Sequence, residues 1–133
     1  MQKTKKFIRY SLLLQLLVLL LLTATVQAEG LQARYLENSG KVSVLEIVVE
    51  DPAPSSVIVK QYLPAGKSIE GTVPDYTKYN TKKQVLTWLF KRPVPGVQRI
   101  VTSYTSPLAG KGASAVIRCK NPKDGTLMTV QVQ

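Results

Sequence analysis

The strongest constraint on the fold is a series of short segments rich in β-branched residues, each ended by proline or glycine. After residue 29 no window keeps apolar residues at a 3.6-residue period, whereas apolar and polar residues alternate repeatedly. Because proline cannot donate to a sheet ladder and glycine favours turns, the segments between them are predicted to be strands. Seven are expected, at 41–50, 57–63, 67–73, 85–90, 97–104, 113–120 and 126–132. This spacing is typical of an all-β sandwich with almost no helix.

A core large enough to fold without disulfides is expected from these strands. Its members are the apolar residues that share one face of each strand. They are Leu45, Ile47, Val49, Val57, Val59, Leu63, Leu86, Trp88, Ile117, Met128, Val130 and Val132. The sandwich domain is therefore predicted to span 41–133, preceded by a polar lead-in at 29–40.

Residues 1–28 have the pattern of a secretory signal peptide. Four basic residues come first, an apolar run follows from Leu12 to Leu22, and Val26-Gln27-Ala28 places small residues before a cut at Glu29. The alternative is an uncleaved anchor, although a spanning helix needs about 20 predominantly apolar residues and this run is shorter. The protein is thus expected to be exported, to the periplasm or to the cell surface and extracellular space.

Charge and chemistry exclude several classes of function. The chain carries 18 basic and 8 acidic residues; the leader holds four of the basic ones, so 14 remain beside the 8 acids. With no histidine and one cysteine, it has no Ser-His-Asp triad, no Cys₄ or histidine zinc site and no internal disulfide. The sparse carboxylates, among them Glu46, Glu50, Asp51 and Asp75, form neither a glycosidase pair nor a calcium cluster. We therefore expect no enzyme, no metal and no cofactor.

Cys119 is the single thiol. It shares a strand face with Ala113, Ala115 and Ile117, which predicts a buried and unreactive cysteine. The alternative is an intermolecular disulfide, because an odd cysteine in an exported protein can pair between chains.

The order of motifs resembles a known family. Val57-Ile58-Val59 is followed by Leu63-Pro64-Ala65-Gly66, then by Tyr79, by Val85-Leu86-Thr87-Trp88 and by Pro95-Gly96. This order is similar to the immunoglobulin-like surface-protein repeat of unknown function in bacterial and archaeal envelope proteins. Two features depart from it: the module stands alone, and Gln61 occupies a usually acidic position. The resemblance implies an immunoglobulin-like β-sandwich of about seven strands in the cell envelope, with Trp88 as a structural residue.

Tyrosines and basic residues gather around the loop that precedes the Trp88 strand. Such mixtures are favoured at interfaces and also suit polyanionic glycans. The alternative is a polar loop with solvated lysines. The candidate interaction surface comprises Tyr62, Tyr76, Tyr79, Lys78, Lys82, Lys83, Lys91 and Arg92.

The function expected from the sequence is that of a non-catalytic structural or adhesive module of the cell envelope. It would self-assemble or dock on a larger surface protein, with the lead-in 29–40 available as a donor strand for strand addition. The alternative is a soluble periplasmic accessory module that recognises an acidic polymer or a protein partner. An acidic glycan is thus a possible partner, a nucleic acid is not expected, and no membrane span is expected after signal cleavage.

Overall fold

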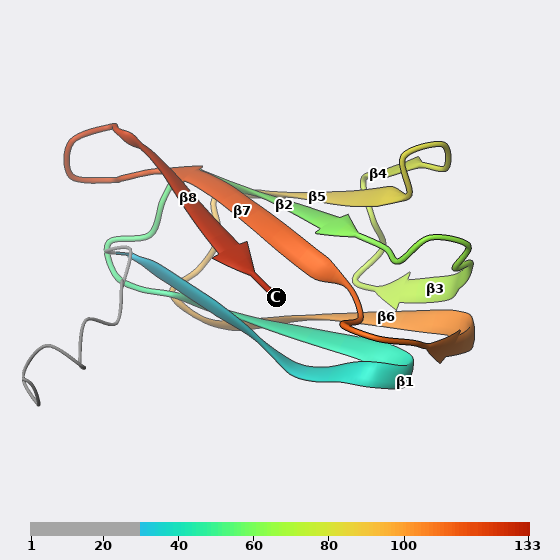
Figure 1. Ribbon diagram of the computed structural model, residues 1–133. Helices are drawn as coiled ribbons and strands as arrows, with labels where there is room; N and C mark the ends of the chain where they lie inside the picture. Colours follow the sequence, from blue (N-terminus) through green and yellow to red (C-terminus); the bar gives the residue numbers. More distant parts are fainter. Residues whose placement is uncertain (1–29) are drawn as a thin grey trace, which may run out of the picture.

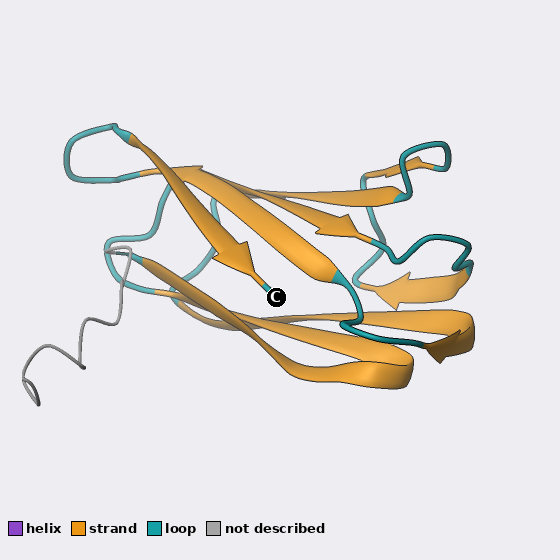
Figure 2. Ribbon diagram, in the orientation of Figure 1, coloured by secondary structure: helices purple, strands orange, loops and turns teal. Residues whose placement is uncertain are grey.

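The computed structural model describes residues 30–133, which form eight β-strands and no helix (Figure 2). The strands are β1 (Leu31–Val49), β2 (Ser56–Tyr62), β3 (Ile69–Val73), β4 (Lys78–Asn80), β5 (Val85–Lys91), β6 (Gly96–Leu108), β7 (Ser114–Lys120) and β8 (Leu127–Val132). The described part of the chain accordingly offers no helix that would cross a membrane. The predicted signal peptide, residues 1–28, lies outside the described residues.

Two antiparallel sheets face each other and enclose one hydrophobic core (Figure 1). The smaller sheet has the order β1-β6-β3 and the larger one the order β4-β5-β2-β7-β8. Ten of the twelve predicted core residues are buried, and Met128 and Val130 are half-buried against them. The prediction of an all-β sandwich is confirmed. The core of the described residues lies within 31–132, so the chain from Glu29 to Gln133 contains all of it.

β1 doubles back on itself at Gly40, so its two halves lie side by side (Figure 1). Gly40 has a φ of +60°, a left-handed conformation that glycine adopts without steric cost. At the open end of this hairpin the backbone N–H of Glu50 donates to the carbonyl of Gly30 at 3.0 Å. Residues 31–39 therefore lie as a fourth strand at the edge of the smaller sheet.

The segment predicted as a polar lead-in, 29–40, is for the most part this first half of β1. Leu31 is only 1% exposed, and Ala33 and Tyr35 pack against the core. The predicted domain boundary at residue 41 consequently falls inside a strand. The boundary is misplaced because the alternating apolar side chains of residues 31–35 pack into this molecule's own core. The segment is therefore not free to act as a donor strand.

The strand order reproduces the immunoglobulin pattern with one insertion. If the halves of β1 are named A and B, the smaller sheet reads A-B-E-D, with β6 as E and β3 as D. The larger sheet then begins G-F-C, with β8, β7 and β2. The β4–β5 hairpin is inserted between D and E and extends the larger sheet beyond C. With β1 counted as one strand, the predicted sandwich has eight strands, one more than expected.

The additional strand, β4, lies in the segment 74–80, which the sequence predicts to be a loop. Its position is determined where the chain crosses from β3 to the larger sheet: the indole N–H of Trp88 donates to the carbonyl of Pro74 at 3.0 Å. The backbone N–H of Thr77 then donates to the carbonyl of Thr87 at 2.8 Å. These bonds set β4 beside β5, where Tyr79 packs against the core.

A buried polar chain joins the two sheets through the core. Gln61 Nε2 donates to Tyr104 Oη at 3.0 Å, and Tyr104 Oη lies 2.8 Å from Ser43 Oγ. Ser43 Oγ in turn donates to Asn38 Oδ1 at 2.9 Å. Gln61 is on β2 of the larger sheet, whereas Ser43 and Tyr104 are on β1 and β6 of the smaller one. Buried polar groups are costly unless paired, so these hydrogen bonds between Gln61, Tyr104 and Ser43 specify how the two sheets are aligned.

Cys119 lies on β7 with its side chain in the core, 5% exposed, as the sequence predicts. Burial raises the pKa of the Cys119 thiol, which lowers the fraction of reactive thiolate. A disulfide between two chains would therefore require the strand to open.

Candidate binding surface

The two sheets differ sharply in charge. The five strands of the larger sheet carry no acidic residue and five basic ones: Lys60, Lys78, Lys91, Arg118 and Lys120. The strands of the smaller sheet carry three basic and three acidic residues. The excess of positive charge on the strands is thus confined to one sheet.

All five basic side chains of the larger sheet lie on its outer face. Val57, Val59 and Gln61 on β2 are buried, so the alternate position Lys60 is directed outward. Lys78, Thr87 and Lys60 are successive cross-strand partners, and the register likewise places the other basic residues on the outer side. Among the described residues, none of these five forms an ion pair with a carboxylate.

The spacing of these charges follows from sheet geometry. Lys78 and Lys60 are two strands apart, which corresponds to about 10 Å between their backbones. Arg118 and Lys120 are two residues apart along β7, or about 7 Å. Between the basic residues lies an exposed apolar pair, Ile58 and Leu89, which are direct cross-strand partners. We call this outer face of the larger sheet the basic face.

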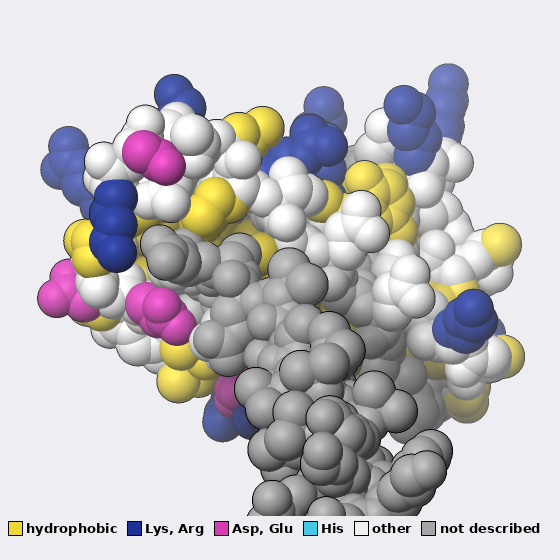
Figure 3. Space-filling view, turned by 60° about the vertical axis from the view of Figure 1, so that its left-hand side comes forward, with side chains coloured by type: hydrophobic (Ala, Val, Ile, Leu, Met, Phe, Trp, Pro, Cys, Tyr) yellow, Lys and Arg dark blue, Asp and Glu magenta, His cyan; other side chains and the backbone are white. Residues whose placement is uncertain are grey.

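Figure 3 shows this distribution on the surface. Several Lys and Arg side chains follow the upper border of the view, where the five-stranded sheet lies in Figure 1, and others lie at the left, the right and the lower edge. Asp and Glu side chains lie in the left half of the same view, one of them in its upper part. The strands of the larger sheet themselves carry no acid that would neutralise the basic face.

Three residues of the predicted interaction surface meet in one groove on the basic face. Tyr62, Lys78 and Lys83 line one groove of about 380 Å³ over β2, β4 and β5. Tyr79 belongs to the core side of β4, and the exposed ring of Tyr76 packs edge-on against it at 5.9 Å between centroids. These two tyrosines do not line the groove.

The remaining predicted residues are dispersed. Lys82 is exposed in the β4–β5 turn beside the groove. Lys91 and Arg92 are at the opposite end of β5, four or more residues beyond Thr87, so about 14 Å or more separates their backbones from the groove. The structure thus brings three of the eight predicted residues together in the groove, with Lys82 in the adjacent turn.

Sequence reasoning missed Lys60, Arg118 and Lys120. These residues are far apart along the chain and become neighbours only through the pairing of β2 with β7. A signal was present: the outward positions of the predicted strands 57–63 and 113–120 include basic residues and no acidic residue.

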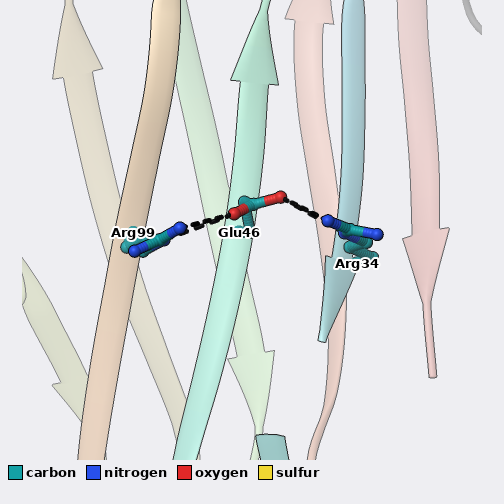
Figure 4. Close-up of polar contacts among 3 residues, drawn as sticks. All are labelled: Arg34, Glu46 and Arg99. Carbon is teal, nitrogen blue, oxygen red and sulfur yellow. Dashed lines mark hydrogen bonds and ion pairs between the residues drawn. The ribbon is translucent and has the colours of Figure 1, made fainter. Parts of the chain in front are cut away.

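The outer face of the smaller sheet has a different chemistry. Glu46 accepts hydrogen bonds from Arg34 and Arg99, each also an ion pair at 3.1 Å, and the three side chains form a row across β1 and β6 (Figure 4). The hydrogen bond from Arg99, aided by the one from Arg34, holds the pKa of the Glu46 carboxyl below its ordinary value. The carboxylate is therefore committed to the two arginines.

Valines surround this row of charges. Val73 and Val97 are 70% and 58% exposed, and Val73 pairs with Val101 on β6. Leu36, in the first half of β1 at the edge of the smaller sheet, is 44% exposed. We call this surface the valine face.

Within residues 30–133 no three His, Cys, Asp or Glu side chains come close enough to hold a metal ion. Glu50, one of the carboxylates considered above, accepts hydrogen bonds from Gly30 and Gln32.

No protein-family model, no curated protein and no solved structure matches this chain. The resemblance to the envelope repeat family remains a prediction from the residues.

Proposed function

We propose that this protein is an exported, non-catalytic binding module that docks an acidic polymer of the cell envelope on its basic face. The observation that carries the proposal is the presence of five outward basic residues and no acid on the strands of one sheet. A surface of one charge sign attracts polyanions and raises their local concentration. The leader-like pattern of residues 1–28 supports the envelope as the place of action.

Binding rather than catalysis is supported by the state of the carboxylates. Glu46 is held by two arginines, and Glu50 accepts hydrogen bonds at the hairpin end. A carboxylate that acts as a general acid or base must be exposed to substrate beside a second reacting group. The basic face provides no such pair on its strands, whereas repeated positive charges suit a polymer with repeated negative ones.

The proposal is tested with two variants of equal net charge. In the chain Glu29–Gln133, Arg118→Gln with Lys120→Gln removes two charges from the basic face. The matched control, Lys41→Gln with Lys111→Gln, removes two exposed charges from β1 and from the β6–β7 loop. Affinity for polygalacturonate and for poly-glutamate is measured by calorimetry at 0.05 M and 1 M salt.

We expect at least one polymer to bind at low salt and to be released at 1 M, where the screening length falls to about 3 Å. The basic-face variant should bind about tenfold more weakly, since each exposed charge contact contributes up to about 1 kcal/mol. The control should match the parent. Absence of binding to both polymers, or equal losses in the two variants, would refute the proposal.

A second candidate function is favoured by the valine face: self-assembly as a structural module through this surface. Val73 and Val97 are more than half exposed on the outer face of the smaller sheet, and exposed apolar patches are a feature of association surfaces. Apolar association would survive 1 M salt, unlike binding to a polyanion.

Light scattering of the chain Glu29–Gln133 in low and high salt distinguishes the candidates. Self-assembly predicts a salt-resistant oligomer that Val73→Lys dissociates. Val94→Lys is the matched control, because Val94 is 71% exposed in the β5–β6 loop and lies off the valine face. A monomer at all salt concentrations contradicts self-assembly.

A further inference from the structure

The groove at one end of the basic face has the composition of a binding subsite. Its volume is about 380 Å³, within the range of small-ligand sites. Three lysines line it: Lys60 from β2, Lys78 from β4 and Lys83 from the β4–β5 turn. No carboxylate lines it. Charge complementarity therefore predicts an anionic occupant.

Uncharged groups in the groove point beyond simple charge attraction. Tyr62, 41% exposed, offers an aromatic surface with a hydroxyl group, and Thr87 adds a second hydroxyl between Lys78 and Lys60. Asn80 also lines the groove. Its Oδ1 accepts from the backbone N–H of Lys83 at 3.0 Å, which holds the turn and leaves the amide nitrogen available to a ligand.

We infer that this groove binds one acidic sugar unit of the polymer, so that the ligand class is an acidic polysaccharide; this inference rests on the proposed function. A sugar ring that carries a carboxylate presents, in one unit, an anionic group for the lysines. It also presents hydroxyls for Asn80 and Thr87 and an apolar ring face for Tyr62. An acidic polypeptide such as poly-glutamate also presents carboxylates, but it has no sugar ring to stack on Tyr62 and no ring hydroxyls. The other basic residues of the face, Lys91, Arg118 and Lys120, then hold adjoining units by charge.

The experiment compares a sugar polyanion with a polyanion that contains no sugar. Tyr62→Ala and Tyr62→Phe are prepared in the chain Glu29–Gln133, and Tyr76→Ala is the matched control. Tyr76 is also 41% exposed but lies outside the groove. Affinities for polygalacturonate and for poly-glutamate are measured at 0.05 M salt. Urea unfolding of each variant shows that it is folded.

We expect Tyr62→Ala to bind polygalacturonate about tenfold more weakly, as expected for loss of an aromatic anchor, and to bind poly-glutamate within twofold of the parent. Tyr62→Phe retains the ring and should bind both polymers like the parent, as should Tyr76→Ala. If Tyr62→Ala has no effect, or weakens both polymers equally, the sugar subsite is refuted while the basic face still stands on its charge variants. If the parent binds neither polymer, the proposed function itself fails.

Discussion

The substitution Tyr104→Phe tests whether the buried polar chain stabilises the sandwich. It removes one oxygen and leaves the ring, so the packing of the core is unchanged. Two hydrogen bonds are lost, to Ser43 Oγ at 2.8 Å and from Gln61 Nε2 at 3.0 Å. Ser43 keeps its bond to Asn38, but Gln61 is 0% exposed and its Nε2 is left without a partner.

An unsatisfied buried donor costs about 1–3 kcal/mol. For a domain near 100 residues, each kcal/mol lowers Tm by about 4–8 °C, so a decrease of about 5–20 °C is expected. Urea unfolding measures the change in unfolding free energy, and a thermal scan measures the change in Tm. Both are followed by the fluorescence of Trp88, because this single tryptophan is 1% exposed in the folded state. The control, Tyr76→Phe, removes an exposed hydroxyl and should remain within about 0.5 kcal/mol of the parent.

A double-mutant cycle completes the test. Once Tyr104→Phe has removed the acceptor, Gln61→Leu should cost less than it does in the parent, with a coupling of about 0.5–3 kcal/mol. Two results would show that the buried hydrogen bonds do not hold the sheets together. One is a loss of unfolding free energy below about 0.5 kcal/mol for Tyr104→Phe; the other is a double variant whose loss equals the sum of the two single losses.

Three further predictions concern particular residues. At neutral pH the parent should be more stable than Glu46→Gln, as measured by urea midpoints. This advantage should decrease below pH 4.5 and vanish below the lowered pKa of Glu46 in the folded state. An advantage that does not depend on pH would contradict a contribution from the ion pairs. Cys119 should react with a thiol reagent only after unfolding, and non-reducing gels should show no dimer. Deletion of 29–39 removes Leu31 and one strand of the sheet, so it should abolish cooperative thermal unfolding; a truncated chain that unfolds cooperatively would restore the lead-in interpretation.

Much of the fold was predictable because most strands have a core face and a solvent face. The alternation in β2 and β5 places Val57, Val59 and Trp88 in the core from sequence alone. β4 was missed because it has only three residues and a polar sequence, and its place depends on the bond from Trp88 to the carbonyl of Pro74. Such a tertiary contact has no signal in a local pattern.

The first half of β1 was assigned wrongly for a different reason. Its alternation of Leu31, Ala33 and Tyr35 is visible in the sequence, but alternation does not tell whether a strand pairs within its own chain or with another one. The hairpin turn at Gly40 decides the matter, because it brings the segment back beside residues 41–49.

The candidate surface was predictable only in part. Lys78 and Lys83 are close in sequence to Tyr79 and Tyr76, so they were found with them, although the tyrosines turn toward each other and away from the groove. Lys60 was missed because the pairing of β2 with β5 and β7, which makes it central to the basic face, is a long-range property.

The most direct test of the central claim, that the basic face is the binding surface, is to map the contact by NMR. Amide shifts of the labelled chain Glu29–Gln133 are recorded during titration with polygalacturonate at low salt. We predict changes on β2, β4, β5 and β7, largest around Lys60, Lys78 and Tyr62, and none on β3 or the valine face. Changes confined to β1, β3 and β6 would contradict the account, as would uniform small changes over both sheets.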